Sequence, residues 1–285
     1  MHAMRKSFIR HSKQEDGGMR FDELTRLVGK RIFLRHLVFI LVRMTTLREW
    51  YLCSVLKKEL NKGPQNFSFL DAGCGMGQFA FRIAKKYPSA NVTGFEQMIQ
   101  RVQDNNHVAA RMGLKNLEFY SRDISQLTEK NRYHFILCNS VLEHIKDDIK
   151  TLEKLYDALY EKGILIIYVP SQEKRVLYAL KRIQDRQILE SKTGKLHDHI
   201  RYYSKEELVS KAVSVGFECL QSTSTYGRYG RWSYDLVTLV QYHRYVRWLF
   251  PLYLIFLHPI VMILMWLDFI QYNKEGNGLM LVCQK

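Results

Sequence analysis

The sequence predicts an α/β fold: a doubly wound, mostly parallel sheet of seven strands, with helices before it and a hydrophobic helical insert before the last strand. Three observations predict it. Short apolar runs alternate with amphipathic segments, a glycine-rich turn follows the first run, and acidic residues close the second and third runs. A chain of 285 residues is long enough for one large domain of this kind with additions.

Each strand and helix of this pattern has an expected place on the chain. Strands are expected at residues 67–70, 91–94, 117–120, 133–138 and 164–169, then from Gly216 onward and at 278–283. Helices are expected at 78–87, 97–112, 147–160, 175–188 and 205–215. Gly163 is expected to end the helix at 147–160, Pro170 to stop the fifth strand, and the Ser204 capping box to begin the helix at 205.

The turn after the first strand carries Gly73, Gly75 and Gly77 at alternate positions. Glycine allows positive φ angles and lets a ligand lie directly against the backbone. The dinucleotide fingerprint G-x-G-x-x-G has its third glycine one position later, so this spacing argues against a pyrophosphate ligand. A strand-to-helix turn that binds nothing is the alternative, and Glu96 at the end of the second strand counts against it.

The expected organisation has four parts. Residues 1–62 form a basic arm and helices, 63–242 the core, 243–275 the hydrophobic insert and 276–285 the last core strand. The N-terminal helices mix arginine with leucine, phenylalanine and tryptophan. This mixture is typical of a cap over a site or of an anchor at a membrane surface.

Residues 248–269 are the most apolar part of the chain and are long enough to cross a bilayer if helical. A single crossing would leave the seventh strand on the wrong side of the membrane, and Pro251 and Pro259 interrupt a straight span. We therefore expect a bent helical pair that dips into one leaflet or folds over the core. A lid or a homodimer contact stays an alternative.

The chain is strongly basic, with 43 Lys and Arg against 28 Asp and Glu, a formal net charge of +15. Residues 1–62 alone hold 14 basic and 6 acidic residues. Such a field favours anionic partners, either nucleic acid or phospholipid, although it can also serve solubility. A basic excess beside apolar helices fits an anionic membrane surface better.

The five cysteines form no C-x-x-C pair, which indicates a reducing compartment. The first twenty residues are polar and lack the apolar core of a signal peptide. We therefore expect a cytoplasmic protein, with peripheral attachment to the inner face of a membrane as the second possibility.

The run D-A-G-C-G-M-G at 71–77, followed by Glu96, resembles the first two motifs of the class I S-adenosylmethionine (SAM) methyltransferases. L-E-H-I at 142–145 and H-x-R-Y-Y-S-x-E-E-L from His199 resemble the small-molecule members related to quinone biosynthesis. The resemblance covers residues 67–217 and departs at His134, where the family usually has Asp. It implies a Rossmann-like sheet and SAM as the cofactor.

The resemblance also implies roles for individual residues. Glu96 would accept both ribose hydroxyls and Asp123 the adenine amino hydrogen, while the glycine loop would line the methionine half. Asp71 and Asp123 could instead cap helices or turns. The full set of expected cofactor residues is Asp71, Gly73, Cys74, Gly75, Gly77, Glu96, Gln97, Asp123, Ile124 and Asn139.

Methyl transfer from SAM is a direct displacement that depends on alignment more than on acid or base chemistry. His144 is the first candidate for a base, because it follows the fourth strand at the expected carboxyl edge, and a packing role is the alternative. His199 is the second catalytic candidate. The expected substrate residues are His197, Arg201, Tyr202 and Tyr203. No metal is expected, because the sequence places no third ligand at a suitable spacing from His197 and His199.

The favoured function is O-methylation of a hydrophobic small molecule, such as a quinone precursor, a phenolic lipid or a lipid-linked intermediate. A nucleic-acid methyltransferase or RNA-binding protein is the second hypothesis, motivated by the charge. Residues 139–142, N-S-V-L, lack the N-P-P-Y clamp used on bases, and no RNA module is recognisable, so no nucleic-acid partner is expected. A SAM-binding scaffold without catalysis is the third hypothesis.

Overall fold

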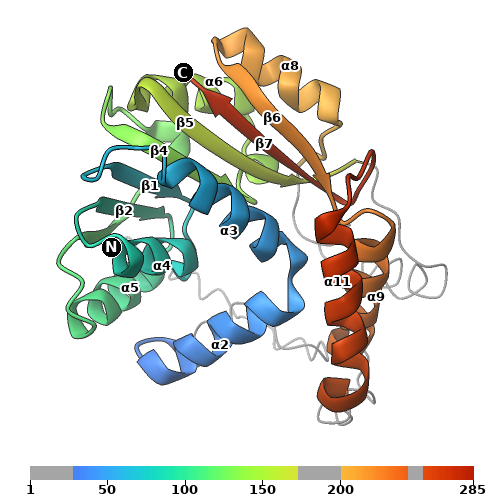
Figure 1. Cartoon of the computed structure of the whole chain (residues 1–285). Helices are drawn as coiled ribbons and strands as arrows, with labels where there is room; N and C mark the ends of the chain where they lie inside the picture. Colours follow the sequence, from blue (N-terminus) through green and yellow to red (C-terminus); the bar gives the residue numbers. More distant parts are fainter. Residues whose placement is uncertain (1–27, 173–199, 243–252) are drawn as a thin grey trace, which may run out of the picture.

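The computed structural model describes residues 28–172, 200–242 and 253–285, which form a seven-stranded sheet in the order β3-β2-β1-β4-β5-β7-β6 (Figure 1). All neighbouring strands pair in parallel except β7, which is antiparallel to both β5 and β6. The predicted fold class is confirmed. The strands are β1 Ser68–Ala72, β2 Asn91–Glu96, β3 Leu117–Ser121, β4 Tyr133–Asn139, β5 Leu159–Pro170, β6 Glu218–Thr225 and β7 Gly278–Gln284.

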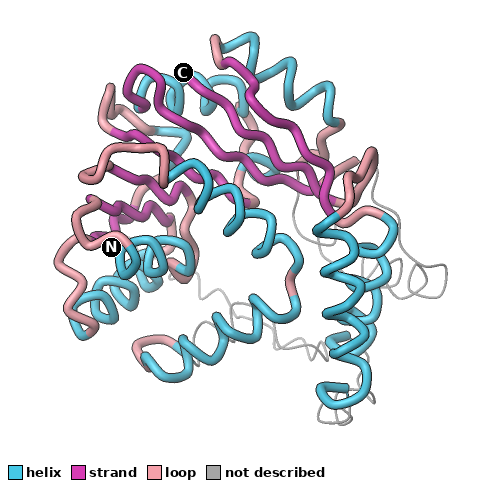
Figure 2. Tube along the Cα trace, viewed as in Figure 1, coloured by secondary structure: helices cyan, strands magenta, loops and turns pink. Residues whose placement is uncertain are grey.

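Helices cover both faces of the sheet (Figure 2). Alternate strand residues explain the two layers: Phe69 points into the core under α3, α4 and α5, and its neighbour Leu70 into the core under α6 and α8. The helices of these layers are α3 Leu47–Leu60, α4 Gln78–Lys86, α5 Ile99–Arg111, α6 Asp148–Ala158 and α8 Lys205–Val215. Short 3₁₀ turns, η1 Ile124–Gln126 and η2 Leu142–His144, follow β3 and β4.

The boundary between α6 and β5 differs from the prediction. The helix expected to run to residue 160 ends at Ala158, and the strand expected from 164 begins at Leu159. Leu159 pairs with Tyr133 of β4, and the register shifts before the next pair, so this strand begins at an irregularity. Sheet pairing therefore overrides the helical pattern, and Gly163 lies inside the strand.

The remaining helices lie at the carboxyl edge of the parallel strands, below the sheet in Figure 1. They are α2 Ile32–Thr45, α9 Arg228–Tyr242 and α11 His258–Ile270, the last preceded by the π-helical turn Tyr253–Leu257, labelled η4. Within the described residues, no helix combines the length and the apolar character needed to cross a membrane. The cationic insert expected at 175–188 lies outside the described residues.

A buried carboxylate joins α9 and α11. Asp268 has no exposed surface, and it accepts hydrogen bonds from Gly230 N at 2.9 Å and from the Tyr51 hydroxyl at 3.1 Å. Asn273 Nδ2 donates to the same carboxylate at 3.2 Å. Since Tyr51 belongs to α3, these bonds fix the α9–α11 hairpin against the core.

Replacing Asp268 by alanine should therefore lower the free energy of unfolding by about 2–3 kcal/mol, because buried donors are left without an acceptor. Urea denaturation followed by circular dichroism measures the change. The matched control is Asp157→Ala on α6, where the acid is exposed and 3.8 Å from Lys130. That change should stay within about 0.5 kcal/mol. Equal stability of the two variants would show that Asp268 does not hold the hairpin.

Candidate functional site

The glycine turn between β1 and α4 faces open space at its middle glycine, Gly75. Gly73, Gly75 and Gly77 have φ angles of 80°, 55° and 75°. A Cβ atom added at Gly73 or Gly77 would clash with Val141 or Phe119, whereas one added at Gly75 would meet no atom within 4 Å. The first and third glycines thus serve packing, and the second lies on a surface that a ligand can approach.

Side chains of two neighbouring helices donate hydrogen bonds to the backbone carbonyls of this turn. Asn105 of α5 donates its side-chain N–H to Gly75 O at 2.9 Å, and Arg35 of α2 donates to Met76 O at 2.9 Å and Gly29 O at 2.8 Å. Arg35 is buried, and burial lowers the pKa of its guanidinium to about 10, so it stays cationic at neutral pH. The cap that α2 forms over the turn therefore has a specific polar anchor.

Glu96 at the end of β2 sits against the same turn. Its carboxylate accepts hydrogen bonds from Gly75 N and Met98 N, each at 3.0 Å, and lies 3.8 Å from Arg101. The predicted neighbour Gln97 is exposed. A partly exposed carboxylate beside an open glycine can accept hydrogen bonds from ribose hydroxyls, so this geometry is compatible with SAM.

Asp71 and Asp123 both cap helical turns. Asp71 is buried at the end of β1 and accepts a hydrogen bond from Ala80 N of α4 at 3.2 Å. Burial raises the pKa of its carboxyl to about 7. Asp123 Oδ1 accepts from Ser125 N at 2.8 Å and so caps η1, with Ile124 buried beside it. Both acids therefore cap helical turns, and their contact with the cofactor stays a prediction.

Cys74 lies within the glycine turn and is half-buried. Burial raises the pKa of its thiol well above the usual range, so the side chain stays neutral. Its backbone N–H donates to Phe95 O at 2.8 Å, as that of Gly73 does at 2.9 Å. The residue therefore contributes shape and backbone bonding, and its thiol is not activated.

A polar group gathers where β4 and β5 end. Arg48, near the start of α3, donates to Ser140 Oγ at 2.7 Å, and its guanidinium lies 5.6 Å from the centre of the Tyr168 ring. The predicted residue Asn139 precedes Ser140, and its buried side-chain oxygen has no hydrogen-bond partner among the described residues. This group lies beside the glycine turn, because β4 pairs directly with β1.

Glu143 and His144, neighbours in the L-E-H-I turn, have opposite environments. Glu143 is 1% exposed, and within the described part of the chain its Oε2 atom has no hydrogen-bond partner. Burial raises the pKa of its carboxyl to about 7, although the charge of Arg48 acts in the opposite direction. His144 is exposed. The proposed role of His144 as a base therefore stays a prediction, and Glu143 becomes a second candidate.

Two of the expected substrate residues, Arg201 and Tyr203, meet at the carboxylate of Asp148. Arg201 and the hydroxyl of Tyr203 both contact Asp148 Oδ2, at 2.7 and 2.8 Å, and Lys211 joins them at 2.8 Å. Burial would raise the pKa of this carboxyl, but the hydrogen bonds and cations outweigh burial and hold the pKa below its ordinary value. Tyr202 is exposed. His197 and His199 lie outside the described residues.

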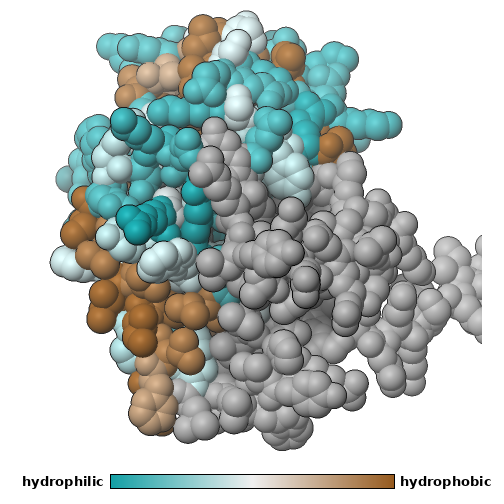
Figure 3. Space-filling view, turned by 90° about the vertical axis from the view of Figure 1, so that its right-hand side faces the viewer, coloured by the Kyte–Doolittle hydropathy of each residue, from teal (hydrophilic) through white to brown (hydrophobic). Residues whose placement is uncertain are grey.

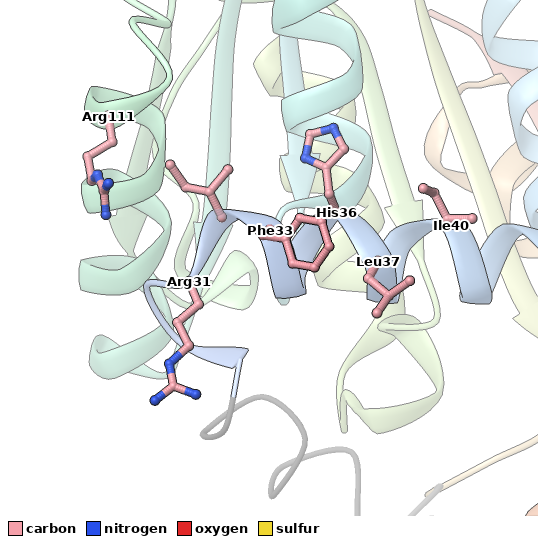
Figure 4. A pocket seen from close by; sticks show the side chains of 7 residues that line it. Arg31, Phe33, His36, Leu37, Ile40 and Arg111 are labelled. Atoms are coloured by element: carbon pink, nitrogen blue, oxygen red, sulfur yellow. The ribbon is translucent and has the colours of Figure 1, made fainter.

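A separate hollow of about 680 Å³ lies on the outer side of α2, lined by Arg31, Ile32, Phe33, His36, Leu37, Ile40 and Arg111 (Figure 4). None of the residues discussed above around Gly75, Glu96 or Glu143 lines it. We therefore assign neither cofactor nor methyl acceptor to this hollow. The described residues also contain no group of His, Cys, Asp or Glu arranged to hold a metal ion.

The structure adds three residues that the motifs did not identify as functional: Arg35, Arg48 and Glu143. Arg35 interrupts an apolar run, which is a usable signal that a helix buries a cation. Glu143 is part of the L-E-H-I motif, but the sequence does not tell which of its two polar residues faces inward. Arg48 reaches the site from about ninety residues away along the chain.

Comparisons with known proteins show the family of this chain. Residues 64–227 match the family model described as a methyltransferase domain. The chain is 22% identical to a ubiquinone biosynthesis O-methyltransferase of Rickettsia akari, over 63% of this chain and 70% of the relative. It is 24% identical to a malonyl-[acyl-carrier protein] O-methyltransferase of Bacillus cereus, over 55% of this chain and 57% of the relative.

Solved structures share the fold. Coclaurine N-methyltransferase bound to N-methylheliamine and S-adenosylhomocysteine superposes with a TM-score of 0.56 at 16% identity, covering 82% of this chain and 70% of that one. The chain spans 27%, 57% and 28% of the length of three curated relatives that it matches. The family model, however, matches more than half of this chain. The chain therefore belongs to the class I SAM-dependent methyltransferases.

Proposed function

We propose that this chain transfers the methyl group of SAM to an oxygen of a hydrophobic small molecule, such as a phenol or a quinone precursor. The observation that carries the proposal is the buried Glu143 carboxylate, which lies beyond the end of β4, next to the strand that bears the glycine turn. A cofactor surface at Gly75 and Glu96 and a group able to take a proton thus share one edge of the sheet.

Bound SAM would supply a methyl group on a positively charged sulfur. Gly75, with its open face, and Glu96 would hold the cofactor from the β1 and β2 side, while the acceptor would enter beside Arg48. The planar guanidinium of Arg48, which lies over the buried ring of Tyr168, suits an aromatic acceptor. Glu143 would take the hydroxyl proton, and Arg48 would favour the negative charge that develops on the acceptor oxygen.

Two relatives support an oxygen acceptor. The ubiquinone biosynthesis and malonyl-[acyl-carrier protein] enzymes are both named as O-methyltransferases, and each aligns with more than half of this chain. Coclaurine N-methyltransferase shares the fold at an identity that supports the fold alone. The acceptor atom is therefore part of the proposal, and assays should offer a phenol and a secondary amine of similar size.

SAM binding is tested by calorimetry on Gly75→Val. This change should weaken SAM binding by at least about tenfold, or roughly 1.4 kcal/mol, because a side chain would occupy the open face. Gly113→Val is the matched control, since Gly113 also has a positive φ angle of 70° and open space around its Cβ position. Glu96→Ala should match Gly75→Val. Tight binding of NAD with none of SAM would contradict the cofactor assignment.

The base is identified by comparing Glu143→Gln with His144→Ala, using methyl transfer to a prenylated catechol. Glu143→Gln should lower turnover by about a hundredfold and leave SAM affinity nearly unchanged, because the amide cannot accept the proton. Since the pKa of Glu143 is raised to about 7, wild-type activity should fall as the pH drops below 7 and the carboxylate is protonated.

This acidic limb should be absent from the residual activity of Glu143→Gln. His144→Ala should keep its activity within about threefold. The opposite pattern, with His144→Ala inactive and Glu143→Gln active, would assign the base to His144 as the sequence predicts.

A further inference from the structure

Helix α11 buries its polar residues and exposes apolar ones. It buries His258 and Asp268, its polar residues, and exposes Ile263, Trp266 and Ile270, by 57%, 52% and 59%. A surface helix of a soluble domain normally turns its polar side to water. Figure 3 views the molecule from the side of α9 and α11, and brown hydrophobic atoms gather at its lower left, at the height of α11. The outer face of α11 is therefore built for a non-aqueous contact.

The orientation of α11 is fixed. The Asp268 carboxylate is bonded to Gly230 N of α9 and to the Tyr51 hydroxyl of α3, so a rotation that hid the apolar face would break both bonds. The ring of Phe269 also contacts Trp50 and Tyr51 edge-on, at 6.0 and 5.2 Å between ring centres. The hydrogen bonds on the buried side of α11 therefore keep its apolar side exposed.

Helix α2 repeats the pattern at the same end of the molecule (Figure 1). Phe33, Leu37 and Ile40 are 79%, 44% and 51% exposed along its outer side. Arg31 and Arg111 lie at one end of this row, on the rim of the hollow in Figure 4. The α2 sequence, IFLRHLVFILVRMT, contains no acidic residue, and the one acid of α11 is buried.

We propose that the outer faces of α11 and α2 dock the chain onto an anionic lipid surface, with the aliphatic and tryptophan side chains in the outer part of one leaflet. A 13-residue helix is about 20 Å long, which suits a helix lying in the plane of the interface. Tryptophan favours that depth, and arginines beside an apolar row favour anionic head groups.

A second copy of the chain is the less suitable occupant. Both partners would carry the same cationic rim and a formal net charge of +15, so pairing these faces would bring like charges together. An anionic bilayer offers the opposite charge and an apolar layer at once. Docking does not depend on the proposed methyl transfer, but it would give a lipid-dissolved acceptor a short path to the site.

The test is sedimentation of the full chain with vesicles of phosphatidylglycerol and phosphatidylcholine, compared with phosphatidylcholine alone. Binding should rise with the anionic lipid and fall with salt. Ile263→Glu should weaken binding by at least about tenfold, because it places a charge in the apolar face. Val213→Glu on α8 is the matched control: it adds the same charge at a 54% exposed valine on the opposite end of the molecule, and it should bind as wild type.

The depth of Trp266 in the bilayer is measured with brominated lipids. Trp266 fluorescence should be quenched by bromine near the head of the acyl chain, and the quenching should largely disappear in Trp266→Phe. Circular dichroism of each variant checks that the fold is intact. Equal vesicle binding by Ile263→Glu and Val213→Glu, or a wild type that stays in the supernatant at low salt, would overturn the proposal. A dimer in light scattering that Ile263→Glu dissociates would assign the face to a second copy instead.

Discussion

The site depends on a backbone constraint: the turn after β1 must hold three residues at positive φ while its peptide groups are fixed from both sides. Phe95 O accepts the N–H groups of Gly73 and Cys74, and Asn105 and Arg35 bind the carbonyls of Gly75 and Met76. Strand β2 and helices α2 and α5 are thereby joined to one turn. Because the open surface at Gly75 is made of backbone, its shape depends on these bonds more than on any side chain that faces the ligand.

Asp71 and Glu143, two buried acids at the carboxyl edge of the parallel strands, are similarly buried but differ in their hydrogen bonds. Asp71 and Glu143 both have a pKa raised to about 7 by burial. Asp71 accepts a bond from the start of α4, which uses the carboxylate to hold a helix in place. Glu143 Oε2 has no such bond among the described residues, and this is why we propose Glu143 as the base. The difference lies in the hydrogen-bond partners rather than in the depth of burial.

Much of the fold could be predicted from the sequence, because short apolar runs typical of buried strands alternate with amphipathic segments typical of helices. The glycine turn also marked the junction between the first strand and the first helix of the sheet. The α6–β5 boundary could not, since it depends on pairing between Leu159 and Tyr133 across the sheet. At the site, motif residues such as Gly75 and Glu96 were predictable, but Arg48 was not, because a distant helix brings it to Ser140. Which residue of the Glu143–His144 pair faces inward depends on the orientation of the 3₁₀ turn η2. The buried role of Asp268 could not be predicted, because this residue is a single acid within an apolar run.

The position of β7 bears on the order in which the chain can fold during synthesis. Because β7 lies between β5 and β6, β6 has no neighbour in the sheet until residues 278–284 have been made. The α9 helix and the apolar α11 helix are synthesised before that strand, so they leave the ribosome attached to an unclosed sheet. During this interval β5 has an unpaired apolar edge and β6 has no strand partner. The time at which β7 pairs thus sets how long this open strand edge is available to other chains.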